Sequence, residues 1–248
     1  MSETMRMFME IGFNIAYLIT IWIMVILMIR AQPNVPEKDK PVTQLFIWAF
    51  ALLALGDTGH VGFRLWAYAL GDLTSTISVF GRELGLVGMG ALATAYTVTI
   101  FYMLVLMIWQ RRYHKPYGWF GGLLWATAVF RLVIMLFPAN EWNNTVPPQT
   151  WSLIRNVPLM ILGFGVAYLI LRDSIKAHDK PFTWVGIMIL VSYAFYFPVI
   201  LLVQRLPLIG MLMIPKTLAY VAIAFIAYFS LFKQPREKEF KGQPMPTD

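Results

Sequence analysis

Ionisable side chains interrupt five of the seven long apolar segments in this sequence. A charged group costs about 3 kcal/mol at the centre of a membrane-spanning helix, so such groups usually bind a ligand, carry protons or pair with one another. Lys216 is the clearest example, because it lies about nine residues into the last segment and hence about 14 Å below a membrane surface. The candidate functional residues are Asp57, His60, Arg64, Arg82, Glu83, Arg131, Arg155 and Lys216.

Three of these residues, Asp57, His60 and Arg64, are separated by helical spacings of three and four. At 100° per residue they lie within an arc of about 60°, and in a membrane that arc must face the bundle interior. The set offers an acid, a titratable imidazole and a cationic anchor for an anion. The alternative is a buried Asp57–Arg64 pair with a hydrogen-bonded His60 that only fixes helix packing.

Proline lies close to polar side chains in the last three segments. A proline inside a helix kinks it and frees a backbone carbonyl, and such carbonyls usually line a cavity or find a polar partner. The combination predicts a polar pocket. Its expected members are Arg155, Tyr196, Lys216 and Tyr220. The neighbouring prolines are Pro158, Pro198 and Pro215.

The expected interior carries more positive than negative charge. Arginine does not deprotonate in proteins, so a buried excess of arginine needs a neutralising partner. A bound anion, a phospholipid headgroup or a carboxylate ligand would supply it. Glu83 is expected either to pair with Lys216 or Arg131 or to lie at the membrane interface. The cations are Arg64, Arg131, Arg155 and Lys216, against Asp57 and Glu83.

The segments that must position these residues are apolar and long. The chain has 248 residues, of which 58% are hydrophobic and 13% charged, with a mean hydropathy of +0.63. These values predict an all-α bundle of seven transmembrane helices in one domain, 1–232, followed by a disordered charged tail, 233–248. The helices are expected near 7–29, 44–70, 78–109, 118–137, 151–171, 182–204 and 207–232.

Basic residues collect in alternate connections and predict the orientation. Lysine and arginine follow the first, third, fifth and seventh segments, whereas the connection 138–150 contains none. By the positive-inside rule the N-terminus is outside and the C-terminus is cytoplasmic. The basic residues are scattered beside apolar helices, so the net charge of +7 indicates topology and not nucleic-acid binding.

Several chemistries are excluded by composition. Cysteine is absent, which excludes disulfides and thiol catalysis. The sequence has no G-x-S-x-G elbow and no H-E-x-x-H pair, and His60 is its single intramembrane histidine, so no metal site is expected. No cofactor and no oligomeric state is indicated, and the expected partners are the lipid bilayer and an anionic lipid or small anion.

Two resemblances follow from these motifs. The stretches GDTGHVGFR, WSLIRNVPLMILG, SYAFYFPV and GMLMIPKTLAYV are similar to those of an uncharacterised family of bacterial seven-helix membrane proteins. That resemblance implies a multi-pass protein of the bacterial cytoplasmic membrane and no particular ligand. Microbial rhodopsins share the helix count and a lysine in the last helix, but Leu212 stands where they carry an acidic residue.

Four functions remain open at this point. The first is a receptor, sensor or carrier whose outer half binds a small anionic or amphiphilic molecule. The second is an intramembrane enzyme that acts on a lipid, with His60 and Asp57 as its acid–base pair. The third is a structural polar core without a ligand. The fourth, a minor one, is a retinal-binding photoprotein that uses Lys216.

Overall fold

The computed structural model describes residues 3–79 and 82–233, with the backbone alone for residues 3–8, 10, 79 and 82. Six helical spans are long and apolar enough to cross a membrane, the last being Pro207–Phe232, which comprises α7 and its flanking helical turns. A seventh helix, α4, is apolar but only 17 residues long. The prediction of seven apolar helices is thereby confirmed. They are α1 (Glu3–Ala31), α2 (Lys40–Ala69), α3 (Leu86–Tyr113), α4 (Gly118–Ile134), α5 (Gln149–Lys176), α6 (Lys180–Leu202) and α7 (Met213–Ala227).

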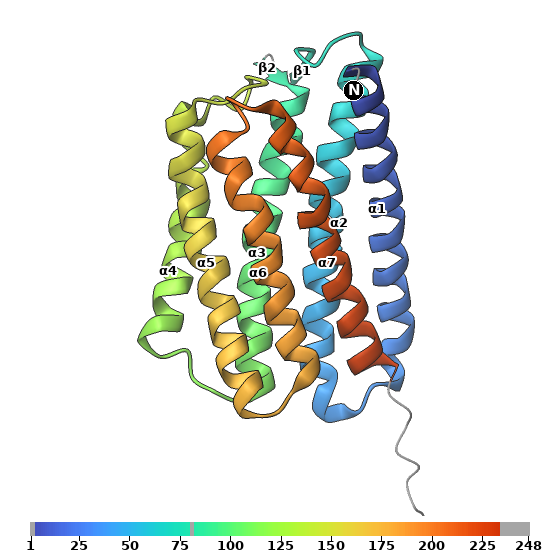
Figure 1. Cartoon of the computed structure of the whole chain (residues 1–248), viewed down its shortest axis with the longest axis vertical. Helices are drawn as coiled ribbons and strands as arrows, with labels where there is room; N and C mark the ends of the chain where they lie inside the picture. The colour runs from blue at the N-terminus through green and yellow to red at the C-terminus, as the bar shows by residue number, and fades with distance from the viewer. Residues whose placement is uncertain (1–2, 80–81, 234–248) are drawn as a thin grey trace, which may run out of the picture.

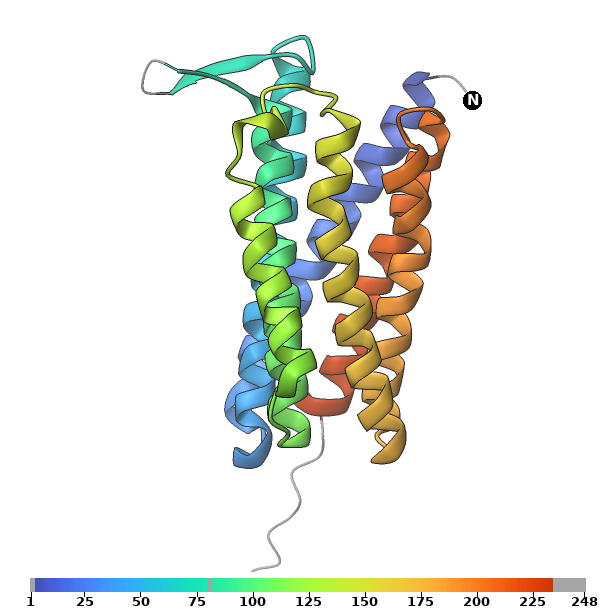
Figure 2. The ribbon, with the colours of Figure 1, turned by 90° about the vertical axis from the view of Figure 1, so that its left-hand side faces the viewer.

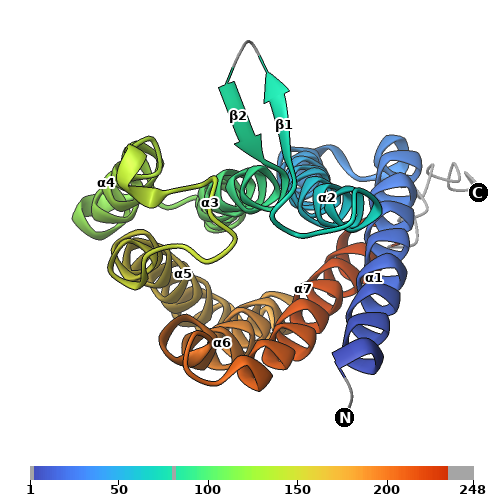
Figure 3. The same ribbon diagram turned by 90° about the horizontal axis from the view of Figure 1, so that it is seen from above.

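The helices form a ring in which sequential neighbours contact each other, and contact between α1 and α7 closes it (Figure 3). α1 crosses the other helices on a diagonal (Figure 2). Two ends of the bundle can be distinguished (Figure 1). We term the one with the N-terminus and strands β1 and β2 the hairpin end, and the opposite one the basic end. The predicted tail, 233–248, lies outside the described residues apart from Lys233.

The outer surface of the ring is apolar. Large side chains such as Ile19, Ile23, Trp48 and Trp119 have exposed fractions between 51% and 82%. A soluble protein would bury such residues, whereas in a bilayer they contact acyl chains at no cost. Long apolar helices with this outward surface indicate a multi-pass membrane protein in contact with lipid.

The start of the third helix differs from the prediction. The sequence predicts a helix near 78–109, but β1 (Thr76–Val79) and β2 (Arg82–Gly85) form an antiparallel hairpin, and α3 begins at Leu86. Ile77 pairs with Leu84 and Ser78 with Glu83 across this hairpin. Apolar and polar residues alternate in β1, and this period of two favours a strand over a helix. The expectation of a helix rested on the apolar content of the segment and not on this alternation.

Ion pairs hold the basic end together. Arg112, near the end of α3, donates to Asp39 at 3.1 Å and to Asp179 at 2.9 Å, the residues that directly precede α2 and α6. Asp173 in α5 accepts from Lys115, Arg172 and the indole of Trp109. Each of these three carboxylates has at least one basic partner at hydrogen-bond distance. No carboxylate of this network is therefore left without a cation.

A chain of aromatic rings fills the core between the two ends. Successive ring centroids lie 5.5 to 6.4 Å apart, in stacked or edge-to-face geometry. Its middle members are at most 1% exposed. The chain consists of Tyr220, Phe101, Phe50, Phe46, Phe182 and Tyr113. It runs along the bundle from Tyr220 in α7 to Tyr113 at the end of α3, and it consists of uncharged side chains.

Candidate functional site

A cavity of about 480 Å³ opens inside the hairpin half of the bundle, within the size range of small-molecule sites. Residues from all seven helices, and from the segment Pro207–Leu212 that leads into α7, form its wall. Eight of the nine residues predicted to form a site line this one cavity: Asp57, His60, Arg64, Arg131, Arg155, Tyr196, Lys216 and Tyr220. The spacing in α2 does place Asp57, His60 and Arg64 on one inward face.

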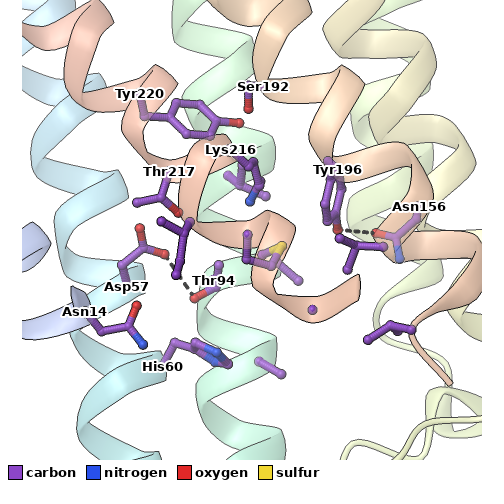
Figure 4. A pocket seen from close by; sticks show the side chains of 18 of the residues that line it. Asn14, Asp57, His60, Thr94, Asn156, Ser192, Tyr196, Lys216, Thr217 and Tyr220 are labelled. Carbon is purple, nitrogen blue, oxygen red and sulfur yellow. Dashed lines mark hydrogen bonds between the residues drawn. The ribbon is translucent and has the colours of Figure 1, made fainter. Parts of the chain in front are cut away.

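The carboxylate of Asp57 is held by hydroxyls. The Tyr17 hydroxyl of α1 donates to it at 2.6 Å, and Thr94 of α3 donates at 3.5 Å while also bonding to the Gly56 carbonyl (Figure 4). No hydrogen bond joins Asp57 to His60 and no ion pair joins it to Arg64 among the residues that the structure describes. The predicted Asp57–Arg64 pair and Asp57–His60 dyad are therefore not formed. Asp57 is fixed by α1 and α3 instead.

Lys216 occupies the middle of the cavity between two aromatic faces. Its ammonium lies 4.6 Å from the ring centroid of Tyr196 and 5.6 Å from that of Tyr220 (Figure 4). Such cation–π contacts stabilise an ammonium without neutralising it. In the described part of the chain Lys216 has no hydrogen-bond acceptor and no ion pair, although it interacts electrostatically with Asp57. The ammonium is thus free to bind a group inside the cavity.

Two arginines form the wall opposite α2. Arg131 of α4, 2% exposed, donates from Nε to the carbonyl of Arg155 at 2.7 Å, and from Nη1 to the Ala95 carbonyl at 2.6 Å and to the Thr99 hydroxyl. Arg155 of α5 stacks on the Trp142 ring, with Cζ 4.3 Å from its centroid. Neutral groups thus orient both guanidinium groups without cancelling their charge.

Glu83 lies outside the cavity. It is an exposed residue of β2 whose carboxylate accepts from the Thr76 hydroxyl at 2.7 Å. The predicted pairing of Glu83 with Lys216 or Arg131 is wrong, and its alternative, a position near the membrane surface, agrees with the hairpin. The reason is the strand conformation, which carries residues 82–85 away from the helical axis of α3. The Arg82 side chain lies outside the described part of the chain.

The cavity therefore contains a larger charge imbalance than the sequence predicts. Its described lining includes four permanently or normally cationic side chains and one carboxylate, that of Asp57. At the basic end, by contrast, every carboxylate of the network has a basic partner. An uncompensated charge in a low dielectric is costly, so an excess of buried cations around the cavity indicates a place for negative charge.

Several lining residues were not predicted. Tyr17 and Asn14 come from α1, and Thr94, Asn156 and Trp142 come from three other parts of the chain. They are uncharged, and single hydroxyls or amides within apolar segments carry too weak a signal to be selected. The spacing of Asn14 and Tyr17 by three residues in an apolar helix could have suggested a second inward-facing stripe. Within the described residues no group of three potential metal ligands occurs.

Comparison with known proteins identifies no relative: no family model, no curated protein and no solved structure matches the chain. The resemblances to a bacterial membrane-protein family and to rhodopsins therefore remain predictions. What is established is a largely helical protein with six or seven long apolar helices and a charged cavity. The geometry of that cavity is the basis for assigning a function.

Proposed function

We propose that this protein is a receptor or sensor of the bacterial cytoplasmic membrane that binds a small anionic or amphiphilic molecule in the cavity of its hairpin half. Arg64, Arg131, Arg155 and Lys216 would hold the anion. Asp57 and His60 would couple its binding to protonation. Glu83 has no part in this site, because it lies outside the cavity.

The observation that carries the proposal is the excess of cations over carboxylates around one cavity. Arginine stays charged, and the two most buried arginines are oriented by carbonyls, a hydroxyl and an indole that leave their charge unneutralised. A bound anion would remove this imbalance. A purely structural core would be expected to pair its charges as the basic end does.

The orientation belongs to the proposal as well. We place the hairpin end outside and the basic end in the cytoplasm, because lysine and arginine concentrate in the connections of the basic end. The cavity would then face the exterior or the outer leaflet.

No observation favours an enzyme or a photoprotein over a receptor or sensor. A general base would need a partner to orient it, and the hydrogen bonds of Asp57 go to Tyr17 and Thr94 and not to His60. Leu212, one turn before Lys216, supplies no counterion for a retinal Schiff base.

Native mass spectrometry of protein purified in an uncharged detergent tests the proposed function. We expect an additional bound mass on the wild type, loss of that mass in Lys216→Met, and its retention in the control Lys176→Met, which removes an exposed lysine at the basic end. Re-addition of the extracted ligand should raise the melting temperature of the wild type but not of Lys216→Met. A wild type without bound mass whose melting temperature responds to no anion would contradict the proposal.

A further inference from the structure

The arrangement of cations within the cavity restricts the ligand further. Tyr196 lies close to them: Lys216 stacks on its ring, and its hydroxyl bonds to Asn156, the neighbour of Arg155, whose carbonyl accepts from Arg131. The Tyr196 hydroxyl donates to Asn156 at 3.1 Å, which fixes the ring between them (Figure 4). Three cations thus converge on one region of the wall.

The charge of the lining favours a doubly charged headgroup. Four cations and one carboxylate leave an excess of three positive charges over the described lining. A carboxylate ligand offsets one of these charges, whereas a phosphate monoester carries about −1.5 to −2 at pH 7 and offers three acceptor oxygens. Guanidinium groups bind phosphate oxygens strongly, and Nη2 is the one nitrogen of Arg131 that the Ala95 and Arg155 carbonyls and the Thr99 hydroxyl do not engage, so it can donate to one such oxygen.

A second opening shows where an apolar chain could lie. A smaller cavity of about 40 Å³ lies between α1 and α2, and it shares Asn14, His60, Val61 and Arg64 with the main cavity. Its other lining residues are Ile11, Leu65 and Tyr68. Because α1 runs diagonally, it diverges from α2 towards the hairpin end (Figure 3). Arg64 therefore lines both cavities and stands beside the gap between α1 and α2, where Ile11, Val61 and Leu65 supply aliphatic side chains.

From these observations we infer that the ligand is a single-chain amphiphile with a phosphate monoester headgroup, held by Arg131, Arg155 and Lys216, whose chain leaves the cavity between α1 and α2. This inference rests on the function proposed above and names its ligand class. Arg64 would contact the headgroup from the side on which the chain leaves.

Three probes separate the headgroup from the chain: dodecyl phosphate, dodecanoate and inorganic phosphate. We expect calorimetric titration of the full-length protein in an uncharged detergent to show dodecyl phosphate binding at least about 10-fold more tightly than either of the others. Arg155→Gln should weaken dodecyl phosphate binding by about 10-fold or more, because a charge-assisted contact is lost. The control Arg111→Gln removes an exposed arginine at the basic end and should bind as the wild type does.

Each deviation has a distinct meaning. Equal or tighter binding of dodecanoate overturns the phosphate headgroup but leaves the anion-binding function intact. Inorganic phosphate that binds as tightly as dodecyl phosphate overturns the chain. No loss of binding in Arg155→Gln means that the signal is partition into micelles, and an equal loss in Arg111→Gln means that the overall positive charge and not the cavity attracts the ligand; either result overturns the site. If none of the three probes binds, the inference fails, while a retained mass in the native spectrum would still support the broader function.

Discussion

At the scale of single residues, the four cations of the cavity differ in what holds them. Arg131 is fixed by two carbonyls and a hydroxyl, and Arg155 by an indole face. Lys216 contacts two aromatic rings and has no hydrogen-bond acceptor within the described chain. Removal of Arg131 therefore leaves polar groups unsatisfied, whereas removal of Lys216 mainly removes charge. The two substitutions should separate stability from binding.

Lys216→Met should change the free energy of unfolding by less than about 1 kcal/mol, because no hydrogen bond is lost and a buried charge disappears. Arg131→Met should cost about 3 kcal/mol or more, since three acceptors lose their donor. Denaturant unfolding of the ligand-free protein in detergent measures both. A Lys216→Met variant as unstable as Arg131→Met would mean that Lys216 is part of the structural core.

The partner of Asp57 can be identified with double-mutant cycles. Lys216 interacts electrostatically with Asp57, whereas Arg64 forms no ion pair with it. Asp57→Asn and Lys216→Met should therefore couple by more than about 0.5 kcal/mol, and Asp57→Asn should not rescue Arg64→Ala. Melting temperatures of the single and double variants, without ligand, give the coupling. Rescue of Arg64→Ala would restore the simple Asp–Arg pair on α2.

At the scale of the elements, close helix contacts shape the cavity. α5 and α6 approach at Gly163, where the ring of Tyr193 occupies the space that a Cβ would need. The Tyr193 hydroxyl donates to the Leu159 carbonyl at 2.9 Å, so the contact also satisfies a buried group. Tyr193 in turn lines the cavity. The packing of these two helices and the form of the cavity wall are therefore linked.

Gly163→Ala should destabilise the protein by about 1–3 kcal/mol, because the new methyl group must displace Tyr193. It should also weaken ligand binding. Gly122→Ala in α4 is the matched control: its Cβ would meet nothing within 4 Å, so the substitution should stabilise the helix by about 0.5–1 kcal/mol. Thermal unfolding of the wild type and both variants in the same detergent measures these changes in stability. Equal stability of the two variants would show that α5 and α6 are less closely packed.

At the scale of the whole molecule, the ring has one end whose described carboxylates are all paired with basic residues and one cavity in which cations outnumber carboxylates. The ion pairs of Arg112 tie together the residues before α2 and α6, so they stabilise the bundle at the basic end. The hairpin half has no comparable ion-pair network within the described residues.

The absence of native cysteine makes the proposed orientation easy to test. Thr145→Cys in the connection 135–148 and Lys38→Cys in the connection 32–39 introduce exposed thiols at opposite ends. In intact bacterial cells a membrane-impermeant maleimide should label Thr145→Cys alone, and both variants after lysis. The reverse pattern in intact cells would place the basic end outside.

The sequence by itself determined the seven apolar helices and the ionisable Asp, His, Arg and Lys residues of the cavity. Apolar length predicts the seven segments, and helical spacing places Asp57, His60 and Arg64 on one face, because both depend on local chemistry. The hydrogen-bond partners of these residues lie far from them in the sequence. Only the packing of the helices shows that Tyr17 and Thr94 hold Asp57 and that carbonyls hold Arg131. Likewise, only the hairpin that precedes α3 shows that Glu83 lies on a strand that points away from the cavity. Tertiary structure therefore decided which charges stay unpaired and so where an anion can bind.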